Sequence, residues 1–199
     1  MSDPLLEIEM KFRVDDRADY ERLAREKLGV EFAAPEREDD LFFRNDALGF
    51  PSQGKALRIR RRGEYLAATF KGPKLDAETK TREELELPLS SRPGALDAAQ
   101  DDWTTFFQRL GFTPATRVVK TRRRGSLVYS GRQFEITLDE LEGVGLFTEL
   151  ETTTPQSQFE IAKSATLALA KTLGLRHSET KSYLALALEA ATGEKIDEK

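Results

Sequence analysis

Residues 5–14 of the chain read LLEIEMKFRV, and this stretch decides how the rest of the sequence is interpreted. Apolar and charged side chains alternate along it with the two-residue period of a β-strand. Ile8, Met10 and Phe12 therefore share one face of the predicted strand. After Leu5, the opposite face carries only charged residues: Glu7, Glu9, Lys11 and Arg13.

The same sorting of charge recurs on strand-like stretches further along the chain. The residues that alternate in this way are Arg58, Arg60 and Arg62; Arg82, Glu84 and Glu86; Lys120, Arg122 and Arg124; and Glu149 and Glu151. Carboxylates bind hard divalent cations, and arginines bind phosphate oxygens through paired donors. A triphosphate needs both, because a metal ion bridges its oxygens while basic groups neutralise the remaining charge. The pattern indicates a site for a metal-bound polyanion, and an exposed sheet laced with salt bridges is the alternative.

The order of the predicted elements favours an α+β fold with an antiparallel sheet. Strand-like stretches cover residues 5–14, 39–44, 56–62, 65–71, 82–89, 117–124, 127–129, 133–141 and 146–153. Helical spacing covers residues 16–28, 93–110, 156–173 and 182–191. The strands mostly follow one another directly, which favours antiparallel pairing over βαβ units. The length fits a single domain, residues 1–199, with a frayed tail over 192–199.

The composition excludes several kinds of site. The chain has no cysteine and a single histidine, His177, so a metal site must use oxygen ligands, which Mg²⁺ and Mn²⁺ prefer. A net charge of −4 argues against generic nucleic-acid binding. No membrane span or secretory signal is evident, so a cytoplasmic protein is expected. Residues 49–55, GFPSQGK, are similar to a P-loop, but Ala56 stands where Ser or Thr is required and a strand follows.

Short motifs spread along the chain resemble those of the CYTH superfamily, also called triphosphate tunnel metalloenzymes. The first is Glu7-x-Glu9-x-Lys11, which is similar to the ExExK signature of that family. The others follow in the family's order: Leu57-Arg58-Ile59-Arg60, Phe70-Lys71-Gly72-Pro73, Arg82-x-Glu84-x-Glu86, Lys120-x-Arg122, Asp139 with Gly143-x-Gly145-x-Phe147-x-Glu149-x-Glu151, and Lys181-Ser182-Tyr183. The resemblance covers about residues 5–184. The K-G-P segment followed by Lys80-Thr81-Arg82 is most similar to the class IV (CyaB-type) adenylyl cyclase branch.

This resemblance implies a fold and a role for each motif. The implied fold is a closed eight-stranded antiparallel β-barrel, or tunnel, with helices packed outside. The implied ligands of Mg²⁺ or Mn²⁺ are Glu7, Glu9, Glu84, Glu86, Asp139, Glu149 and Glu151. The implied contacts to the triphosphate are Lys11, Arg58, Arg60, Arg82, Lys120, Arg122 and Lys181. Lys71 matches the lysine proposed to activate the attacking water in family phosphatases, and burial among other cations can turn a lysine into a base.

The implied function is a metal-dependent enzyme that acts on a triphosphate, with class IV adenylyl cyclase activity (ATP to cyclic AMP plus pyrophosphate) as the first expectation. A phosphohydrolase acting on inorganic triphosphate or thiamine triphosphate is the alternative, because both reactions use the same clamp. A non-catalytic binder of polyanions or nucleotides is a third interpretation, which the presence of the main metal carboxylates disfavours. Nucleic-acid and membrane partners are not expected. Family members often form homodimers, which the sequence neither supports nor excludes.

Overall fold

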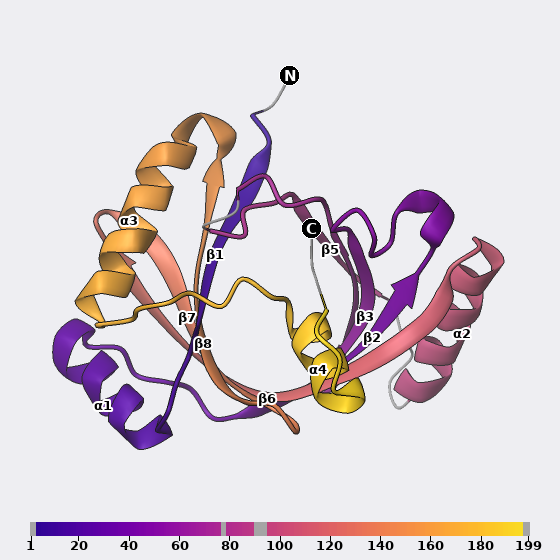
Figure 1. Ribbon diagram of the computed structural model, residues 1–199, viewed down its shortest axis with the longest axis horizontal. Coiled ribbons are helices and arrows are strands. Elements are labelled where there is room, and N and C mark those ends of the chain that lie inside the picture. The colour runs from indigo at the N-terminus through magenta and orange to yellow at the C-terminus, as the bar shows by residue number, and fades with distance from the viewer. Residues whose placement is uncertain (1–2, 77–78, 90–94, 197–199) are drawn as a thin grey trace. The chain divides into compact units, whose positions relative to one another are not determined.

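The computed structural model describes residues 3–76, 79–89 and 95–196 (Figure 1). Within these ranges the chain forms eight strands and four α-helices. In chain order they are β1 (Leu5–Arg13), α1 (Arg17–Leu28), β2 (Glu36–Arg44), β3 (Ala56–Arg62), β4 (Tyr65–Lys71), β5 (Glu84–Pro88), α2 (Leu96–Arg109), β6 (Thr113–Tyr129), β7 (Arg132–Leu141), β8 (Gly145–Pro155), α3 (Phe159–Thr172) and α4 (Tyr183–Thr192). None of the helices in these ranges has the length and apolar character needed to cross a membrane.

Most predicted elements are confirmed, and the differences have local causes. The β3–β4 hairpin turns at Gly63-Glu64 as predicted, and α1 ends at Gly29, whose φ of 67° is left-handed. The two strands predicted over 117–129 form one strand, β6. Gly125 does not interrupt it but allows a close approach, since a Cβ there would lie 2.5 Å from Val30 Cγ1. The predicted start of α2 at residue 93 and the tail end, residues 197–199, lie outside the described residues.

The closed barrel that the family resemblance implies is not formed by the described strand pairs. The strands are hydrogen-bonded in the order β1-β8-β7-β6-β2-β3-β4-β5, and the described residues contain no ladder that joins β1 to β5. A single antiparallel bridge, between Glu7 and Arg82, reaches β1 from the segment before β5. In that segment Leu75 N donates to Thr81 O at 2.7 Å, and Lys80 has a φ of 25°. β5 begins at Glu84, after this turn-like backbone.

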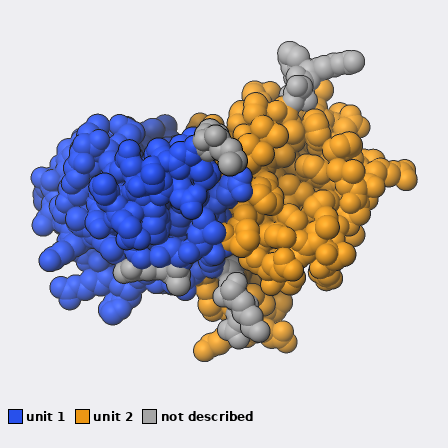
Figure 2. Space-filling model, turned by 90° about the horizontal axis from the view of Figure 1, so that it is seen from above, with its two compact units in different colours: residues 1–35, 74–83, 121–180 blue, residues 36–73, 84–120, 181–199 orange. Residues whose placement is uncertain are grey.

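The chain divides into two compact units, which Figure 2 shows in blue and orange. The first unit consists of residues 1–35, 74–83 and 121–180. The second consists of residues 36–73, 84–120 and 181–199. β6 is therefore divided between the two units, and each unit has its own core and its own charged sheet face.

In the first unit, α1 and α3 cover the apolar face of β1, β7 and β8 (Figure 1). The buried residues of this core are Met10, Phe12, Tyr20, Ala24, Val30, Phe134, Ile136, Leu138, Leu150, Ala165, Leu169, Ala170 and Leu173. The Tyr20 hydroxyl lies 2.8 Å from Thr148 Oγ1, which satisfies its polar end inside the core. Because side chains alternate along each strand, Glu7, Glu9 and Lys11 of β1 and Glu149 and Glu151 of β8 lie on the face away from α1 and α3. Glu140 of β7 differs, because it pairs with Arg17 at the start of α1.

In the second unit, α2 packs on the apolar face of the sheet. Its core contains Phe43, Phe50, Leu57, Ile59, Leu66 and Leu96, with Trp103 and Phe107 of α2 packed against it. The ring centroids of Phe43 and Phe107 lie 5.3 Å apart in an edge-to-face arrangement. On the other face, the Lys120 ammonium lies 4.7 Å from the centroid of the Tyr183 ring at the start of α4. The second unit thus has α2 on its apolar face and α4 on its charged face.

Candidate functional site

Within the first unit, the register of β1 against β8 brings four predicted site residues together. Glu9 lies directly opposite Glu151, and Lys11 lies directly opposite Glu149. The Lys11 ammonium is 3.4 Å from Glu149 Oε1, and both side chains are buried. Two glutamates placed directly opposite each other repel, so the Glu9–Glu151 pair costs stability unless a cation is near.

Glu9, Glu149 and Glu151, here called the carboxylate cluster, have the geometry of a metal site. One carboxylate oxygen from each lies within 4.8 Å of the others. Burial raises the pKa of Glu151 well above its ordinary value; Arg122 opposes this, and the charges of Glu149, Glu7 and Glu9 add to it. Hard oxygen donors that crowd one another in this way fit Mg²⁺ or Mn²⁺, because a divalent cation relieves their repulsion.

Arg122 on β6 connects the carboxylate cluster to Asp139 on β7. Its guanidinium donates to both Asp139 oxygens, at 2.7 and 2.5 Å, and also hydrogen-bonds Glu149. The Asp139 side chain is fully buried. A carboxylate held bidentately by arginine orients that arginine firmly. Arg122, a predicted phosphate contact, and Asp139, a predicted metal ligand, therefore form an ion pair beside the carboxylate cluster.

Lys80 lies in the same cluster, although sequence reasoning assigned it no role. Its ammonium donates to Glu9 Oε1 at 3.1 Å, and the residue is only 4% exposed. Burial, followed by the positive charge of Lys80, lowers the pKa of Lys11 to about 7, against the opposing effect of Glu149 and Glu9. The first unit thus holds two buried lysines against its carboxylates.

Arg82 lies on the same sheet face through its bridge to β1. The two backbone hydrogen bonds between Glu7 and Arg82 measure 3.1 and 3.2 Å, so the two side chains point to the same side. Arg82 is 7% exposed, and the described part of the chain shows no hydrogen bond or ion pair of its guanidinium. A buried arginine without a carboxylate partner suits an anionic ligand, because burying an uncompensated charge is unfavourable.

In the second unit, Arg58 and Arg60 on β3 form a separate arginine cluster with two carboxylates of β2. Arg60 donates to both oxygens of Asp40 at 2.7 Å, and Arg58 donates to Asp40 at 3.1 Å. Glu38, with no exposed side-chain surface, lies 3.1 Å from Arg60 and 3.4 Å from Lys120. Sequence reasoning missed Glu38 and Asp40. The signal was present, because they alternate on β2 and Asp40 pairs directly with Arg60.

Asp40 is held as an anion by this arginine cluster. Burial would raise its pKa, but the Arg58 and Arg60 charges, the hydrogen bond from Arg60 and the Lys120 charge outweigh burial and lower the pKa to about 2. Arg58 also lies 3.8 Å from Glu84, so Arg58, Arg60 and Lys120 face three carboxylates, Glu38, Asp40 and Glu84. These contacts hold the guanidinium groups of the two arginines in place.

The remaining predicted residues of the second unit are placed as follows. Lys71 on β4 pairs with Glu84 on β5, and both are largely buried. Glu86 is exposed and accepts hydrogen bonds from Tyr65 at 3.1 Å and Thr69 at 3.0 Å. Lys181 pairs with Glu189 of α4. The carboxylate group with metal-ligand spacing therefore contains neither Glu84 nor Glu86, within the described ranges.

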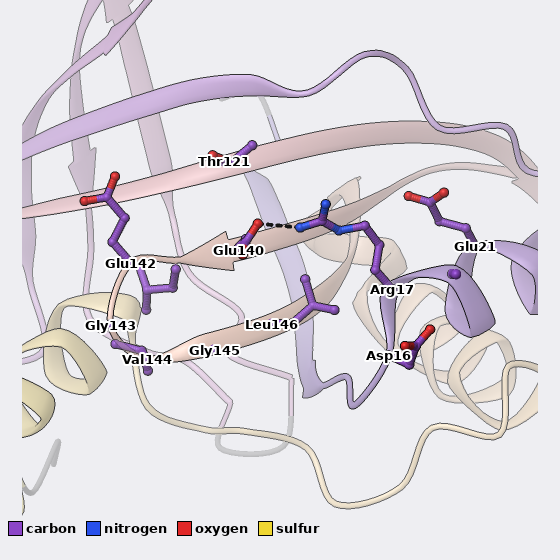
Figure 3. A pocket seen from close by; sticks show the side chains of 12 residues that line it. Asp16, Arg17, Glu21, Thr121, Glu140, Glu142, Gly143, Val144, Gly145 and Leu146 are labelled. Carbon is purple, nitrogen blue, oxygen red and sulfur yellow. Dashed lines mark hydrogen bonds and ion pairs between the residues drawn. The ribbon is translucent and has the colours of Figure 1, made fainter.

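A pocket of about 760 Å³ lies elsewhere in the first unit, between the start of α1 and the β7–β8 turn (Figure 3). Arg17 and Glu140, which form an ion pair across it, and Glu142 contribute to its lining. None of the predicted site residues lines this pocket. It is therefore distinct from the carboxylate cluster.

Comparison with known proteins shows the family to which the chain is similar. The sequence profile of the CYTH domain family matches residues 5–183. A Methanocaldococcus jannaschii protein, named "Putative adenylate cyclase MJ0240", is 31% identical over 147 residues, which cover 74% of this chain and 77% of that protein.

Solved structures share the fold over most of the chain. The PH1819 protein from Pyrococcus horikoshii is 32% identical with a TM-score of 0.76, and the match covers 92% of this chain and 98% of that one. The Hippeastrum protein HpAC1, described as a "putative adenylyl cyclase" with a dominant triphosphatase activity, is 21% identical with a TM-score of 0.56. That match covers 96% of this chain and 97% of that one, and at this identity it concerns the fold alone.

Proposed function

Because the chain belongs to the CYTH domain family, we propose that it is a divalent-metal-dependent enzyme that acts on triphosphates. The favoured reaction is the conversion of ATP to cyclic AMP and pyrophosphate. The carboxylate cluster is the observation that carries this proposal. Its oxygens lie within 4.8 Å of one another beside buried cations, which is the combination that a metal-bound polyphosphate requires.

The residues of the first unit have proposed roles in binding. Glu9, Glu149 and Glu151 hold the metal, with Glu7 beside them on the same strand face. A bound Mg²⁺ or Mn²⁺ would neutralise charge on the phosphate oxygens. Lys11, Arg82 and Arg122 contact those oxygens. Asp139 orients Arg122 through their bidentate pair, in addition to its implied part in the metal site.

The cations of the second unit have proposed roles in phosphate binding. Arg58, Arg60 and Lys120 offer donors on one sheet face, and Lys181 begins the segment that leads into α4. Glu38 and Asp40 hold the two arginines in fixed orientations. Preorganised donors of this kind bind phosphate with less loss of side-chain entropy than mobile surface cations. Glu84 and Glu86 remain proposed additions to the metal ligands.

Triphosphate hydrolysis is the second candidate function. The relative that is 31% identical is named as an adenylate cyclase, which favours cyclisation. The Hippeastrum protein shows that the fold is compatible with a dominant triphosphatase activity. In the cyclase the ribose 3′-hydroxyl attacks the α-phosphorus, whereas in the hydrolase water attacks the terminal phosphorus. The two reactions differ in their products and can be separated directly.

Product analysis tests the proposed function. The purified protein is incubated in parallel with ATP, inorganic triphosphate and thiamine triphosphate, each with Mg²⁺, Mn²⁺ or a chelator. Cyclic AMP with pyrophosphate identifies a cyclase, and orthophosphate release identifies a hydrolase. Tight triphosphate binding without any product at all metal concentrations would show a non-catalytic binder and contradict the proposal.

Lys71 is the proposed catalytic base, and its replacement separates two roles. If Lys71 accepts a proton from the attacking water or hydroxyl, Lys71→Met should lower kcat about a hundredfold with little change in KM. If its ammonium only contacts phosphate, as its pairing with Glu84 also allows, KM should rise instead. Steady-state kinetics with the preferred triphosphate distinguishes these outcomes. Lys74→Met, a change at a half-buried neighbour that donates to the Thr180 carbonyl, is the matched control.

A further inference from the structure

Lys80 is the buried group that the proposed function does not use. Its ammonium lies 3.1 Å from Glu9 Oε1, and Glu9 belongs to the carboxylate cluster. The side chain is 4% exposed, which is rare for lysine without a functional or pairing requirement. Lys80 thus places a cation against one of the two oxygens of a carboxylate in that cluster.

Hydrogen bonds fix the described residues on either side of Lys80. Asp76 accepts hydrogen bonds from the backbone N and the hydroxyl of Thr79, at 2.8 and 2.9 Å. The second oxygen of Asp76 accepts from Lys163 of α3 at 2.8 Å, which ties the loop to the helix. The bridge between Glu7 and Arg82 fixes the other end of the loop to β1.

The backbone at Lys80 is strained, which argues that its side chain does more than fill space. Its φ of 25° lies in the region that L-residues rarely adopt and that glycine adopts freely. A lysine in a conformation that favours glycine points to a role for the ammonium itself. The strain also means that glycine can replace Lys80 without a backbone penalty, which makes a clean deletion of the charge available.

A divalent cation and the Lys80 ammonium compete for Glu9. A Mg²⁺ ion binds carboxylate oxygens at about 2.1 Å. An ammonium at 3.1 Å from one oxygen of the Glu9 carboxylate would then lie within a few ångströms of the metal. Two cations at that separation in a buried site repel strongly. One of them has to move, and the flexible four-carbon stem of lysine allows the ammonium to do so.

We propose that Lys80 is the resident counter-cation of Glu9, that a divalent metal displaces its ammonium, and that the displaced ammonium then binds an oxygen of the triphosphate. This inference rests on the proposed function and deepens it. Lys80 weakens the binding of metal alone and strengthens the binding of metal together with triphosphate. The residue therefore couples the two ligands, in the sense that each makes the other bind better.

The test measures Mn²⁺ binding to the full chain without any triphosphate, by titration calorimetry or by the electron paramagnetic resonance of free Mn²⁺. Lys80→Gly should bind Mn²⁺ about tenfold more tightly than the unmodified protein, because a competing cation has been removed. Lys80→Met should change the affinity in the same direction. Lys80→Arg keeps the charge and should stay near the original affinity. Lys171→Gln removes an exposed lysine of α3 and controls for net charge.

The second measurement concerns the triphosphate. In Lys80→Gly and Lys80→Met the KM for inorganic triphosphate with Mn²⁺, or its dissociation constant where no product forms, should rise about tenfold. Mn²⁺ affinity that is unchanged or weaker in both variants, or no Mn²⁺ binding by any of the proteins, overturns the inference. Turnover by the unmodified protein is measured separately and tests the proposed function. If the protein turns over triphosphate but Lys80→Gly leaves the Mn²⁺ affinity unchanged, the proposed function stands and only the role of Lys80 is contradicted.

Discussion

Replacing Glu9 with glutamine is expected to lower triphosphate turnover about a hundredfold or more. Glu9 supplies one oxygen of the carboxylate cluster, whose three side chains lie within 4.8 Å of one another. Loss of one anionic ligand weakens the metal's stabilisation of transition-state charge by about 3 kcal/mol, which corresponds to about a hundredfold in rate. Glutamine keeps the size and the acceptor oxygen, so the fold should survive. Initial rates at saturating Mg²⁺ and Mn²⁺ measure the effect.

The control for this variant is Glu160→Gln. Glu160 is an exposed carboxylate in the first turn of α3, in the same unit, and its replacement makes the same change in net charge. Its activity should stay close to that of the unmodified protein. Circular dichroism and thermal melting confirm that both variants are folded. Full metal-dependent activity in Glu9→Gln would remove the carboxylate cluster from the mechanism.

Asp40→Asn should destabilise the protein by about 3 kcal/mol at neutral pH. Asp40 is 3% exposed and accepts three hydrogen bonds from Arg58 and Arg60 at 2.7 to 3.1 Å. Removing its charge leaves those arginines buried with too few anions, and breaking a buried pair in this way typically costs about 3–5 kcal/mol. Urea or guanidinium unfolding measures the change in the free energy of unfolding.

The penalty of Asp40→Asn should depend on pH in a defined window. The pKa of Asp40 is about 2 in the folded protein, against an ordinary value of 3.8. As pH falls below the ordinary value, the unfolded chain binds a proton before the folded chain does, so the contribution of Asp40 to stability declines. It is fully present above about pH 4 and is lost as pH approaches 2. The difference between the two proteins should therefore shrink across this window by about 2 kcal/mol.

The matched control is Asp97→Asn in the same unit. Asp97 of α2 also pairs with an arginine, Arg61, but its side chain is 85% exposed. Exposed pairs contribute little because water screens them. This variant should unfold at nearly the same denaturant concentration as the unmodified protein. An equal loss of stability in the two variants would show that burial of the Asp40 pairs is not what makes them strong.

The parts of the fold that the sequence predicts well depend on local patterns. The strict alternation of LLEIEMKFRV places Glu9 and Lys11 on one face of β1, and the structure confirms it. The β3–β4 hairpin is predicted to the residue because Gly63-Glu64 separates two alternating runs. β6 is predicted as two strands because glycine within a strand usually signals a break, whereas Gly125 serves a contact with Val30 that only the tertiary structure shows.

The parts of the candidate site that escape prediction depend on register or on loop geometry. Asp40 is recognisable only once β2 is aligned with β3, because that register places it opposite Arg60. Lys80 reaches the carboxylate cluster because its own backbone has a positive φ, and no periodic sequence pattern predicts such a backbone. The Arg82-x-Glu84-x-Glu86 motif is predicted within one strand, whereas Arg82 forms an isolated bridge to Glu7 and β5 begins at Glu84.

The position of β5 at one end of the strand order bears on the solubility of the protein. β5 is the last strand in the hydrogen-bonding order, and its Leu85 and Leu87 are about half exposed. An exposed apolar edge can template aggregation between molecules. β5 counters this tendency by being only five residues long, by carrying Glu84 and Glu86, and by ending at Pro88. Glu84 and Glu86 therefore oppose self-association through β5 as well as being candidate ligands. Variants that neutralise them need to be tested for aggregation by light scattering before any loss of activity is interpreted.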